Sequence, residues 1–309
     1  MIQVTTVGDS NPTTQAEMLD NIAYLLSNVS YSSIASFLTC RRKFFYEYIL
    51  AMRPVTEPLA PVFGRVMHEA VNVWFASRDI NAAIACFEAN YIENLQVDDV
   101  RTIRNAARLL RKYATQYQED NLVVLPNTTE QKFLIPISDF TPDNAVVHVV
   151  GRFDRVVQFQ GMVVPMETKT TTRLGYQYFK QFAPNYQIDL YAWAFTQLYS
   201  QVPPGCLIDA LKVAKGEVEV ARDFISVADA PHRFISNLLP ILHDMRKCLL
   251  SIQSQIQAGK FEHLDLHDLY LNTTQCTMYG ECMFRGIDIL PEDDRLQALY
   301  RDYTKRRHN

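Results

Sequence analysis

The order of hydrophobic patterns along the chain predicts an α/β protein whose central mixed sheet is flanked by helices, with an N-terminal helical part. Helical periodicity dominates the first 120 residues, and runs rich in Val, Phe and Ile follow it. Helical and β-type patterns then alternate from residue 184 to about 258. Helices that cover the faces of a sheet bury the apolar sides of both kinds of element, so this order favours a layered α/β domain.

The N-terminal third is expected to be helical. After a polar tail, Thr14 and Glu17 form a capping-box pattern before an apolar run. A second helix is predicted to start near Ser32 or Ser33 and to continue through residue 48, until Pro54 and Pro58 break it. The clearest helical pattern then places its apolar residues at i, i+3, i+4 and i+7: Phe63, Val66, Met67, Ala70, Val71, Trp74 and Phe75.

The remaining elements follow from the same patterns. Pro184 suits the first turn of a helix that runs to about residue 199. Helices are expected at 80–94, 98–118 and 230–258, and strands at 130–137, 146–159, 162–169, 206–213 and 217–225. These elements predict a short N-terminal part (1–28), a single domain (29–295, with a helical segment at 62–120 and cysteines near both ends) and a basic tail (296–309).

Composition narrows the function. The chain has 309 residues, 48% hydrophobic, and a net charge of −4, so a nucleic-acid binder of this kind must rely on a local positive groove or on bound metal. We find no apolar run of membrane-spanning length and no secretory signal. We therefore expect a cytoplasmic protein without membrane contact, in which the six cysteines are metal ligands or buried residues rather than disulfides.

The most informative stretch is a predicted hairpin around Gln160-Gly161. A two-residue turn there places Asp154 opposite Glu167, with Lys169 on the same face. Two opposed carboxylates repel, and a divalent cation such as Mg²⁺ or Mn²⁺ would offset the repulsion. The alternative is that Lys169 or Arg155 neutralises the pair in an ordinary ionic network. A slip by one residue would send Asp154 to the other face, and Pro165 requires an edge or a bulge on its outer side.

Asp154 followed by Glu167-Thr168-Lys169 resembles the core of the PD-(D/E)XK nucleases. Gly64 to His68 resembles the G-x-x-x-H element of the RecB-like branch, and Gln187 to Tyr191 resembles its Q-x-x-x-Y motif. The resemblance implies a restriction-endonuclease-like core. It also implies that His68, Asp154, Glu167 and the Thr168 carbonyl hold Mg²⁺ or Mn²⁺, that Lys169 acts on the attacking water, and that Gln187, Tyr191 and Thr170 contact nucleic acid. Core packing is the simpler reading of His68 or Tyr191 taken alone.

The cysteines resemble those of iron–sulfur members, which include AddB-type subunits and the CRISPR adaptation nucleases. Cys40, Cys276 and Cys282 match that outline, and Asp288 stands about where a fourth cysteine is expected. The resemblance implies a 4Fe-4S cluster that joins the two ends of the domain. The alternatives are unligated or zinc-bound thiols. Cys86, Cys206 and Cys248 lie in apolar patterns and are expected in the core.

The resemblance implies a metal-dependent DNA nuclease, an exonuclease or end-processing enzyme in recombination, repair or mobile-element biology, in bacterial cytoplasm or a phage-infected host. Its substrate would be DNA that is single-stranded or has free ends, and a protein partner in a repair complex fits the same picture. Arg41, Arg42 and Lys43 stand beside aromatic residues, as in single-strand binding sites, although a solvated helix face explains them equally well. Two other functions remain: a catalytically silent nucleic-acid-binding scaffold, and a zinc-stabilised structural protein.

Overall fold

The computed structural model describes residues 13–55, 57–137, 145–175, 177–227 and 229–260, and beyond them only 272, 282–284, 287, 290, 295, 298 and 303–305. The chain divides into two compact units. Unit 1 comprises 1–57, 134–150 and 237–309, and unit 2 comprises 58–133 and 151–236. The predicted α/β class, with mixed sheets and flanking helices, is confirmed. The prediction of one domain over 29–295 stays a prediction.

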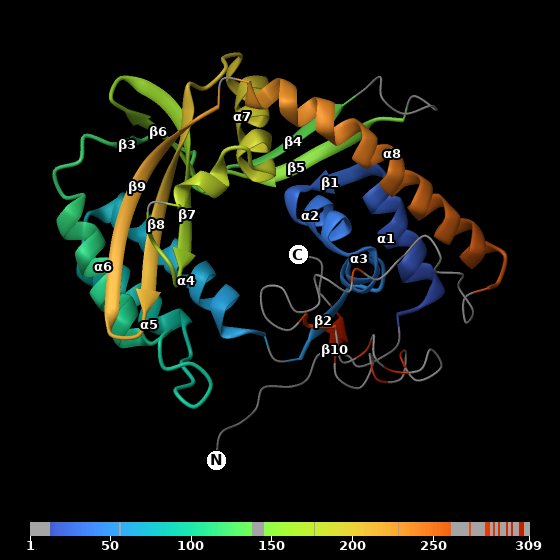
Figure 1. Cartoon of the computed structure of the whole chain (residues 1–309), viewed down its shortest axis with the longest axis horizontal. Helices are drawn as coiled ribbons and strands as arrows, with labels where there is room; N and C mark the ends of the chain where they lie inside the picture. The colour runs from blue at the N-terminus through green and yellow to red at the C-terminus, as the bar shows by residue number, and fades with distance from the viewer. Residues whose placement is uncertain are drawn as a thin grey trace. The chain divides into compact units, whose positions relative to one another are not determined.

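Unit 2 is built on a five-stranded mixed sheet (Figure 1). Strands β7 and β8 are parallel, whereas the other neighbours are antiparallel. The strands lie in the order β3 (Val123–Val124), β6 (Arg155–Phe159), β7 (Met162–Thr171), β8 (Gly205–Ala214) and β9 (Glu217–Ser226).

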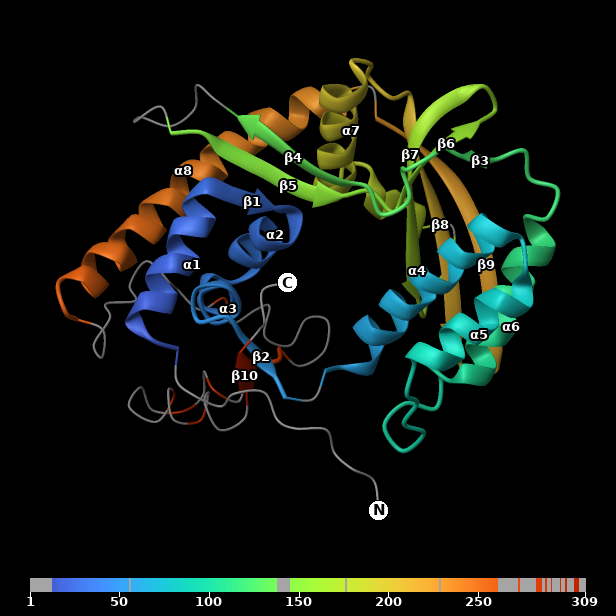
Figure 2. The same ribbon diagram turned by 180° about the vertical axis from the view of Figure 1, so that it is seen from behind.

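Helices cover both faces of this sheet. Helices α4 (Leu59–Ser77), α5 (Ile80–Asn90) and α6 (Ile103–Gln116) lie on one face, in front of the strands in Figure 2. Helix α7 (Tyr186–Tyr199) packs on the other face, against Cys206 and Ile208 of β8. Successive residues of a strand point to opposite faces, so β8 supplies side chains to two separate cores.

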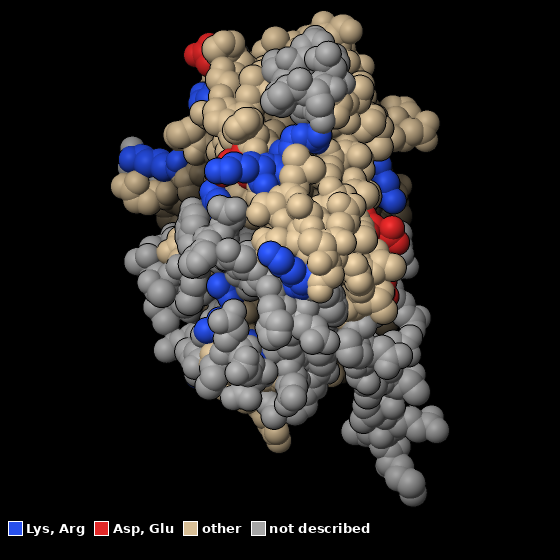
Figure 3. All heavy atoms as spheres, turned by 90° about the vertical axis from the view of Figure 1, so that its right-hand side faces the viewer, with Lys and Arg blue, Asp and Glu red and all other residues tan. Residues whose placement is uncertain are grey.

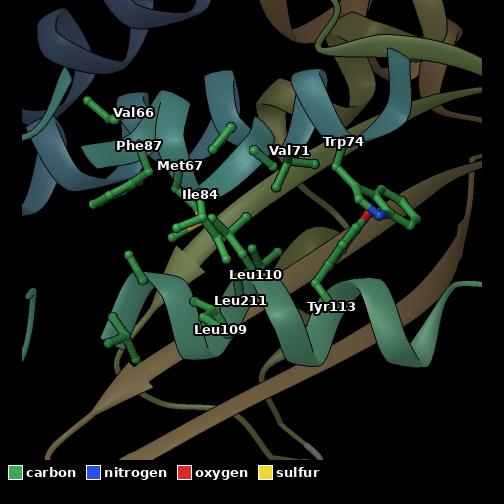
Figure 4. Packing of buried hydrophobic residues seen from close by; sticks show 14 of the residues in the cluster. Val66, Met67, Val71, Trp74, Ile84, Phe87, Leu109, Leu110, Tyr113 and Leu211 are labelled. Atoms are coloured by element: carbon green, nitrogen blue, oxygen red, sulfur yellow. The ribbon is translucent and has the colours of Figure 1, made fainter. Parts of the chain in front are cut away.

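A core rich in aromatic side chains lies under α4, α5 and α6. Figure 4 shows Trp74 of α4 against Tyr113 of α6, and their ring centroids lie 5.2 Å apart in an edge-on arrangement. The apolar stripe predicted for α4 is confirmed, because Phe63, Val66, Met67, Ala70, Val71 and Trp74 are all buried. Burial of this face anchors α4 to the sheet.

Unit 1 contains α1 (Gln15–Ser27), whose predicted capping box between Thr14 and Glu17 is confirmed. Its three-stranded sheet has the order β1, β5, β4, and β1 runs parallel to β5. These strands span Asn28–Ser30, Val147–Arg152 and Lys132–Ile137. A separate pair joins β2 (Met52–Pro54) to β10 (Tyr303–Lys305), and α8 (Ala230–Gln257) includes residues of both units. No helix among the described residues is both long and apolar enough to cross a bilayer.

The predicted continuous helix from Ser32 to Tyr48 is wrong. Helix α2 (Tyr31–Thr39) ends at Cys40, whose backbone is extended, and the chain continues as α3 (Arg41–Phe44) and a π-helix (Phe45–Ile49). The apolar periodicity persists through the break, so a pattern of side chains could not reveal it.

The helices predicted at 80–94 and 98–118 are shorter, at Ile80–Asn90 and Ile103–Gln116, and two further boundaries also differ from the prediction. The expected strand 146–159 is two strands, β5 and β6, which are separated by Phe153 and Asp154. Pro184 does not lie in the first turn of α7, because Asn185 is the N-cap and the helix starts at Tyr186. The Asn185 side chain accepts hydrogen bonds from the backbone N–H groups of the first turn, which makes it the better cap.

A buried ionic network joins β8, β9 and α6. Asp209 is fully buried and accepts hydrogen bonds from the Arg222 guanidinium at 2.5 and 2.8 Å, and from the Tyr113 hydroxyl. Arg222 also pairs with Asp120 and stacks on the Tyr117 ring. A buried ion pair costs much more when one partner is removed than it contributes when intact.

We therefore expect Asp209→Ala to lower the free energy of unfolding by about 3–5 kcal/mol, because it leaves a buried guanidinium without its main partner. Urea unfolding followed by circular dichroism measures this. Asp223→Ala changes an exposed carboxylate on the neighbouring strand β9 and should cost less than about 0.5 kcal/mol. Equal costs for the two variants would show that the network does not stabilise the sheet.

Candidate functional site

The hairpin of β6 and β7 has the register that the sequence predicted. Gln160 and Gly161 form its two-residue turn with φ angles of 49° and 79°, and Phe159 pairs with Met162. Positive φ at both positions is the geometry of a type I′ turn, which matches the twist of the strands. The ladder continues to Arg155 opposite Met166, so the next positions along it are Asp154 and Glu167.

Pro165 fits this sheet because its two neighbouring strands are offset. It pairs with Val156 of β6, whereas the ladder with β8 begins one residue later, at Met166. The missing N–H of proline therefore removes no bond from the β8 ladder, as the predicted edge requires.

Asp154 lies in the break between β5 and β6. Its backbone oxygen accepts a hydrogen bond from Glu130 N–H at 2.9 Å, so this carbonyl is satisfied outside the strand ladder. Its carboxylate oxygen Oδ2 lies 3.2 Å from Nδ1 of His68 and accepts the Thr168 backbone N–H at 2.8 Å. Asp154 and Glu167 are both buried, with relative exposures of 7% and 2%.

Glu167 has one satisfied and one unsatisfied oxygen. Oε1 accepts hydrogen bonds from Lys169 Nζ at 2.5 Å and from Gln187 Nε2 at 3.0 Å. Oε2 is buried, and no hydrogen bond of ordinary geometry reaches it. A buried carboxylate oxygen without a donor is costly, and a cation is one way to satisfy it.

Gln187 and Tyr191 form a supporting chain of hydrogen bonds from α7. Gln187 Oε1 accepts from Lys169 Nζ at 2.8 Å, and Gln187 Nε2 also donates to the Tyr191 hydroxyl at 3.1 Å. The Tyr191 hydroxyl donates to the backbone oxygen of Arg152 at 2.9 Å. Gln187 thus contacts two of the predicted catalytic side chains, and Tyr191 joins Gln187 to the backbone of Arg152.

Charges in the site shift the pKa values of its groups. Burial alone would raise the pKa of Asp154, but His68, the Arg155 charge and the Thr168 backbone N–H together outweigh burial and lower that pKa to about 2. Burial would likewise lower the pKa of His68, and the Asp154 contact raises it instead. Burial and the Asp154 charge raise the pKa of Glu167, although Lys169 opposes them. The three groups therefore form one coupled electrostatic unit.

The donor set suits a hard divalent cation. Asp154 and Glu167 offer carboxylate oxygens, one of them unsatisfied, and His68 adds an imidazole. Across the part of the chain that the structure describes, no three His, Cys, Asp or Glu side chains already converge as a complete ligand set. His68 is paired with Asp154 and Lys169 with Glu167, so binding of a cation would exchange these contacts for metal–ligand bonds.

Helix α4 lies close to β7 at Gly64. A Cβ atom at that position would lie 3.0 Å from the Thr170 hydroxyl oxygen, so glycine permits this approach. Thr170 therefore lies against α4, on the opposite face of β7 from Lys169. Its predicted contact with nucleic acid stays a prediction.

The residues predicted to hold the cluster, and the basic run from Arg41 to Lys43, belong to unit 1. Cys40 is buried at the junction of α2 and α3, and Cys282 is half-buried, whereas Cys276 and Asp288 lie outside the described residues. Arg41 pairs with Asp244 and lies over the Phe37 ring, 4.7 Å from its centroid.

Lys43 lines a pocket of about 830 Å³ in unit 1. Hydroxyl-bearing side chains dominate the lining, and Tyr31, Tyr48 and Arg53 also contribute to it. Glu47 is the acidic residue of the lining, and it is engaged by Ser36 Oγ at 2.7 Å and Lys43 Nζ at 3.7 Å. On the face of the molecule shown in Figure 3, the described Lys and Arg side chains are scattered rather than gathered in one patch.

Residues 28–286 match the family model of the PD-(D/E)XK nuclease superfamily. The chain belongs to this superfamily. Membership implies a nuclease, a hydrolase that acts on nucleic acid, and such nucleases usually use Mg²⁺ or Mn²⁺. The chain is also similar to a solved structure, "Crystal structure of SSO0001", with 10% sequence identity and a TM-score of 0.31, covering 75% of this chain and 84% of that one. No curated protein matches the chain.

The sequence of this nuclease did not reveal that Asn72 and Glu130 belong to the site. It indicated only one role for Arg155, which was to neutralise the carboxylates. Asn72 links the other two residues through hydrogen bonds of 2.9 Å to Glu130 and 2.7 Å to Arg155. The available signal was spacing, because Asn72 stands four residues after His68 and so shares its helix face.

The His68–Asp154 pair predicts a pH-dependent stability in metal-free protein. A raised histidine pKa contributes stability below its unfolded value, near 6.5, and that contribution is lost as the pH rises through the folded value. In EDTA, His68→Ala should therefore destabilise the protein more at about pH 5.5 than at about pH 8.5. Urea unfolding at both pH values measures this, with the exposed His232→Ala as the control. A cost that is equal at both pH values, or larger at the higher one, would contradict the assignment.

Proposed function

We propose that this chain is a Mg²⁺- or Mn²⁺-dependent deoxyribonuclease of the RecB-like branch, an exonuclease or end-processing enzyme that hydrolyses phosphodiester bonds in recombination, repair or mobile-element processing. The observation that supports it most is the unsatisfied, buried Oε2 of Glu167 beside the Asp154 carboxylate and the Lys169 ammonium. A structural protein has no reason to keep such a group, since its burial lowers stability.

The residues have separate roles in this proposal. Asp154, Glu167, His68 and the Thr168 carbonyl would hold the cation, which supplies Lewis acidity at the scissile phosphate and lowers the pKa of water. Lys169 would orient the attacking water and stabilise the negative charge that develops on the phosphate. Gln187 holds Lys169 by the 2.8 Å contact with its amide oxygen, and Tyr191 holds Gln187 in turn.

This geometry supports a positioning role for the Q-x-x-x-Y residues more than direct contact with a phosphate. Tyr191 is 6% exposed, and its hydroxyl donates to the backbone of Arg152. Gln187 is half-buried and can still reach a substrate that approaches Lys169.

The pocket in unit 1 supports a substrate with unpaired nucleotides, either a single strand or a free end. Its Tyr31 and Tyr48 rings can stack on bases, and Lys43 and Arg53 can contact phosphates. Of the predicted basic run, Lys43 is the better candidate for contact with a strand, because it lines this pocket and Arg41 does not.

We further propose that Cys40, Cys276 and Cys282 hold a 4Fe-4S cluster, with Asp288 as the candidate for the fourth ligand. The break at Cys40 supports this, because an extended residue between two helices can present its thiol outside the helical hydrogen-bond pattern. A cluster between segments so distant in sequence would close a long loop and stabilise the unit.

Lys169→Ala should lower the rate of cleavage by about 100- to 10,000-fold, which is the usual range for loss of a group that moves or orients a proton. The assay uses labelled single-stranded, duplex and flap DNA with Mn²⁺, and an RNA strand as a comparison. Lys132→Ala, on the exposed side of β4, is the matched control and should cut normally. Unchanged cleavage by Lys169→Ala would overturn the site assignment, and binding without cleavage by the wild-type protein would favour the silent scaffold.

Purified wild-type protein should contain iron and acid-labile sulfide, and Cys40→Ser should lose both. Metal analysis together with the visible absorption spectrum checks this. Cys86→Ser, at a half-buried position of α5, is the control and should retain the cluster. Zinc without sulfide in the wild-type protein would instead support the zinc-stabilised alternative.

A further inference from the structure

Asn72 stands on the same face of α4 as the candidate metal ligand His68, one helical turn further along. Its side-chain amide is used at both ends: Oδ1 accepts from Arg155 Nη2 at 2.7 Å, and Nδ2 donates to Glu130 Oε1 at 2.9 Å. An amide suits both contacts, because its oxygen accepts from the guanidinium while its nitrogen donates to the carboxylate.

The hydrogen bond between Asn72 and Arg155 matters for stability because Arg155 is a fully buried cation. Its Nη1 donates to the Thr168 hydroxyl at 2.8 Å, and the guanidinium lies over Phe75, 4.7 Å from the ring centroid. These partners are neutral, so the Asn72 amide is the link between Arg155 and the negative charge of Glu130. Loss of such a link leaves the buried charge less compensated, which destabilises its surroundings.

Arg155 links the two strands of the site, β6 and β7, through its place in the chain and its hydrogen bond to Thr168. Arg155 follows Asp154 directly in the chain, and Thr168 lies between Glu167 and Lys169. The hydrogen bonds from Asn72 through Arg155 to Thr168 therefore run from α4 into the backbone segments that carry both carboxylates.

Two contacts fix α4 on either side of His68. Gly64, one turn before it, sets the closest approach to β7 at Thr170, and Asn72, one turn after it, is bonded to Arg155. A helix held at both positions cannot slide along the strand, so the imidazole is kept within 3.2 Å of the Asp154 carboxylate. Displacements of about 1 Å are enough to impair a ligand set or a catalytic group.

We propose that Asn72 is a positioning residue: through Arg155 it sets the register of α4 against β7 and so holds His68 in place for the divalent cation. This inference rests on the proposed metal-dependent function. Asn72 itself would touch neither the cation nor the substrate.

A double-mutant cycle on Mn²⁺ affinity tests the proposal. The four proteins are the wild type, Asn72→Ala, His68→Ala and the double variant, and isothermal titration calorimetry measures Mn²⁺ binding to each. Asn72→Ala should weaken binding by about 10- to 100-fold, the range for groups that orient a metal ligand. In the His68→Ala background the same change should alter binding by less than about 2-fold, because the residue through which Asn72 acts is gone. Asn90→Ala, exposed on α5, is the control and should bind as the wild type does.

An equal loss in both backgrounds would overturn the proposal, since it would show that Asn72 does not act through His68. Normal Mn²⁺ binding by Asn72→Ala would overturn it as well. If the wild type takes up no Mn²⁺, the proposed function itself fails, which is a separate outcome. Should Asn72→Ala not fold, Asn72→Asp retains the acceptor for Arg155 and loses the donor to Glu130; it should bind Mn²⁺ with an intermediate affinity, and a wild-type affinity would contradict the positioning role.

Discussion

The structure of the site depends on one unfavourable interaction: two carboxylates, Asp154 and Glu167, are placed opposite each other in a mostly buried part of the sheet. Like charges repel strongly where little water screens them. Each carboxylate is therefore given cationic and hydrogen-bonding partners. Asp154 has His68 and a backbone N–H, and Glu167 has Lys169 and the Gln187 amide. One buried oxygen of Glu167 still has no hydrogen-bond donor, and a divalent cation would supply the missing positive partner.

This constraint explains how the surrounding elements are arranged. Helix α4 brings His68 to Asp154, and α7 brings Gln187 to Glu167 from the opposite face of the sheet. The break between β5 and β6 turns the Asp154 side chain out of the regular ladder and toward His68. The helices with the largest apolar contacts are thus also the ones that supply polar groups to the site, so packing of the core and geometry of the site are linked. A nuclease built in this way can keep its ligands ordered before metal or nucleic acid arrives.

Much of this was predictable from the sequence, because local chemistry determines it. Gln160-Gly161 specifies a tight turn, the turn sets the register, and the register places Asp154 opposite Glu167. The capping box at Thr14 and the apolar stripe of α4 are equally local. The break at Cys40 was missed because the apolar pattern continues across it, and Asn72 was missed because its partners, Glu130 and Arg155, are distant in sequence. Contacts of that kind leave no periodic signal. The roles of the cysteines in unit 1 depend on Cys276 and Asp288, which lie outside the described residues.

The most direct test of this account is a crystal structure of the protein with Mn²⁺, using the anomalous signal of manganese to locate the ion. The account predicts an anomalous peak bonded to Glu167 Oε2 and to the Asp154 carboxylate, with Lys169 moved off Glu167 or sharing it. A peak elsewhere, or a bound ion that leaves Glu167 Oε2 without a ligand, would contradict the claim that this carboxylate pair is held together for a cation.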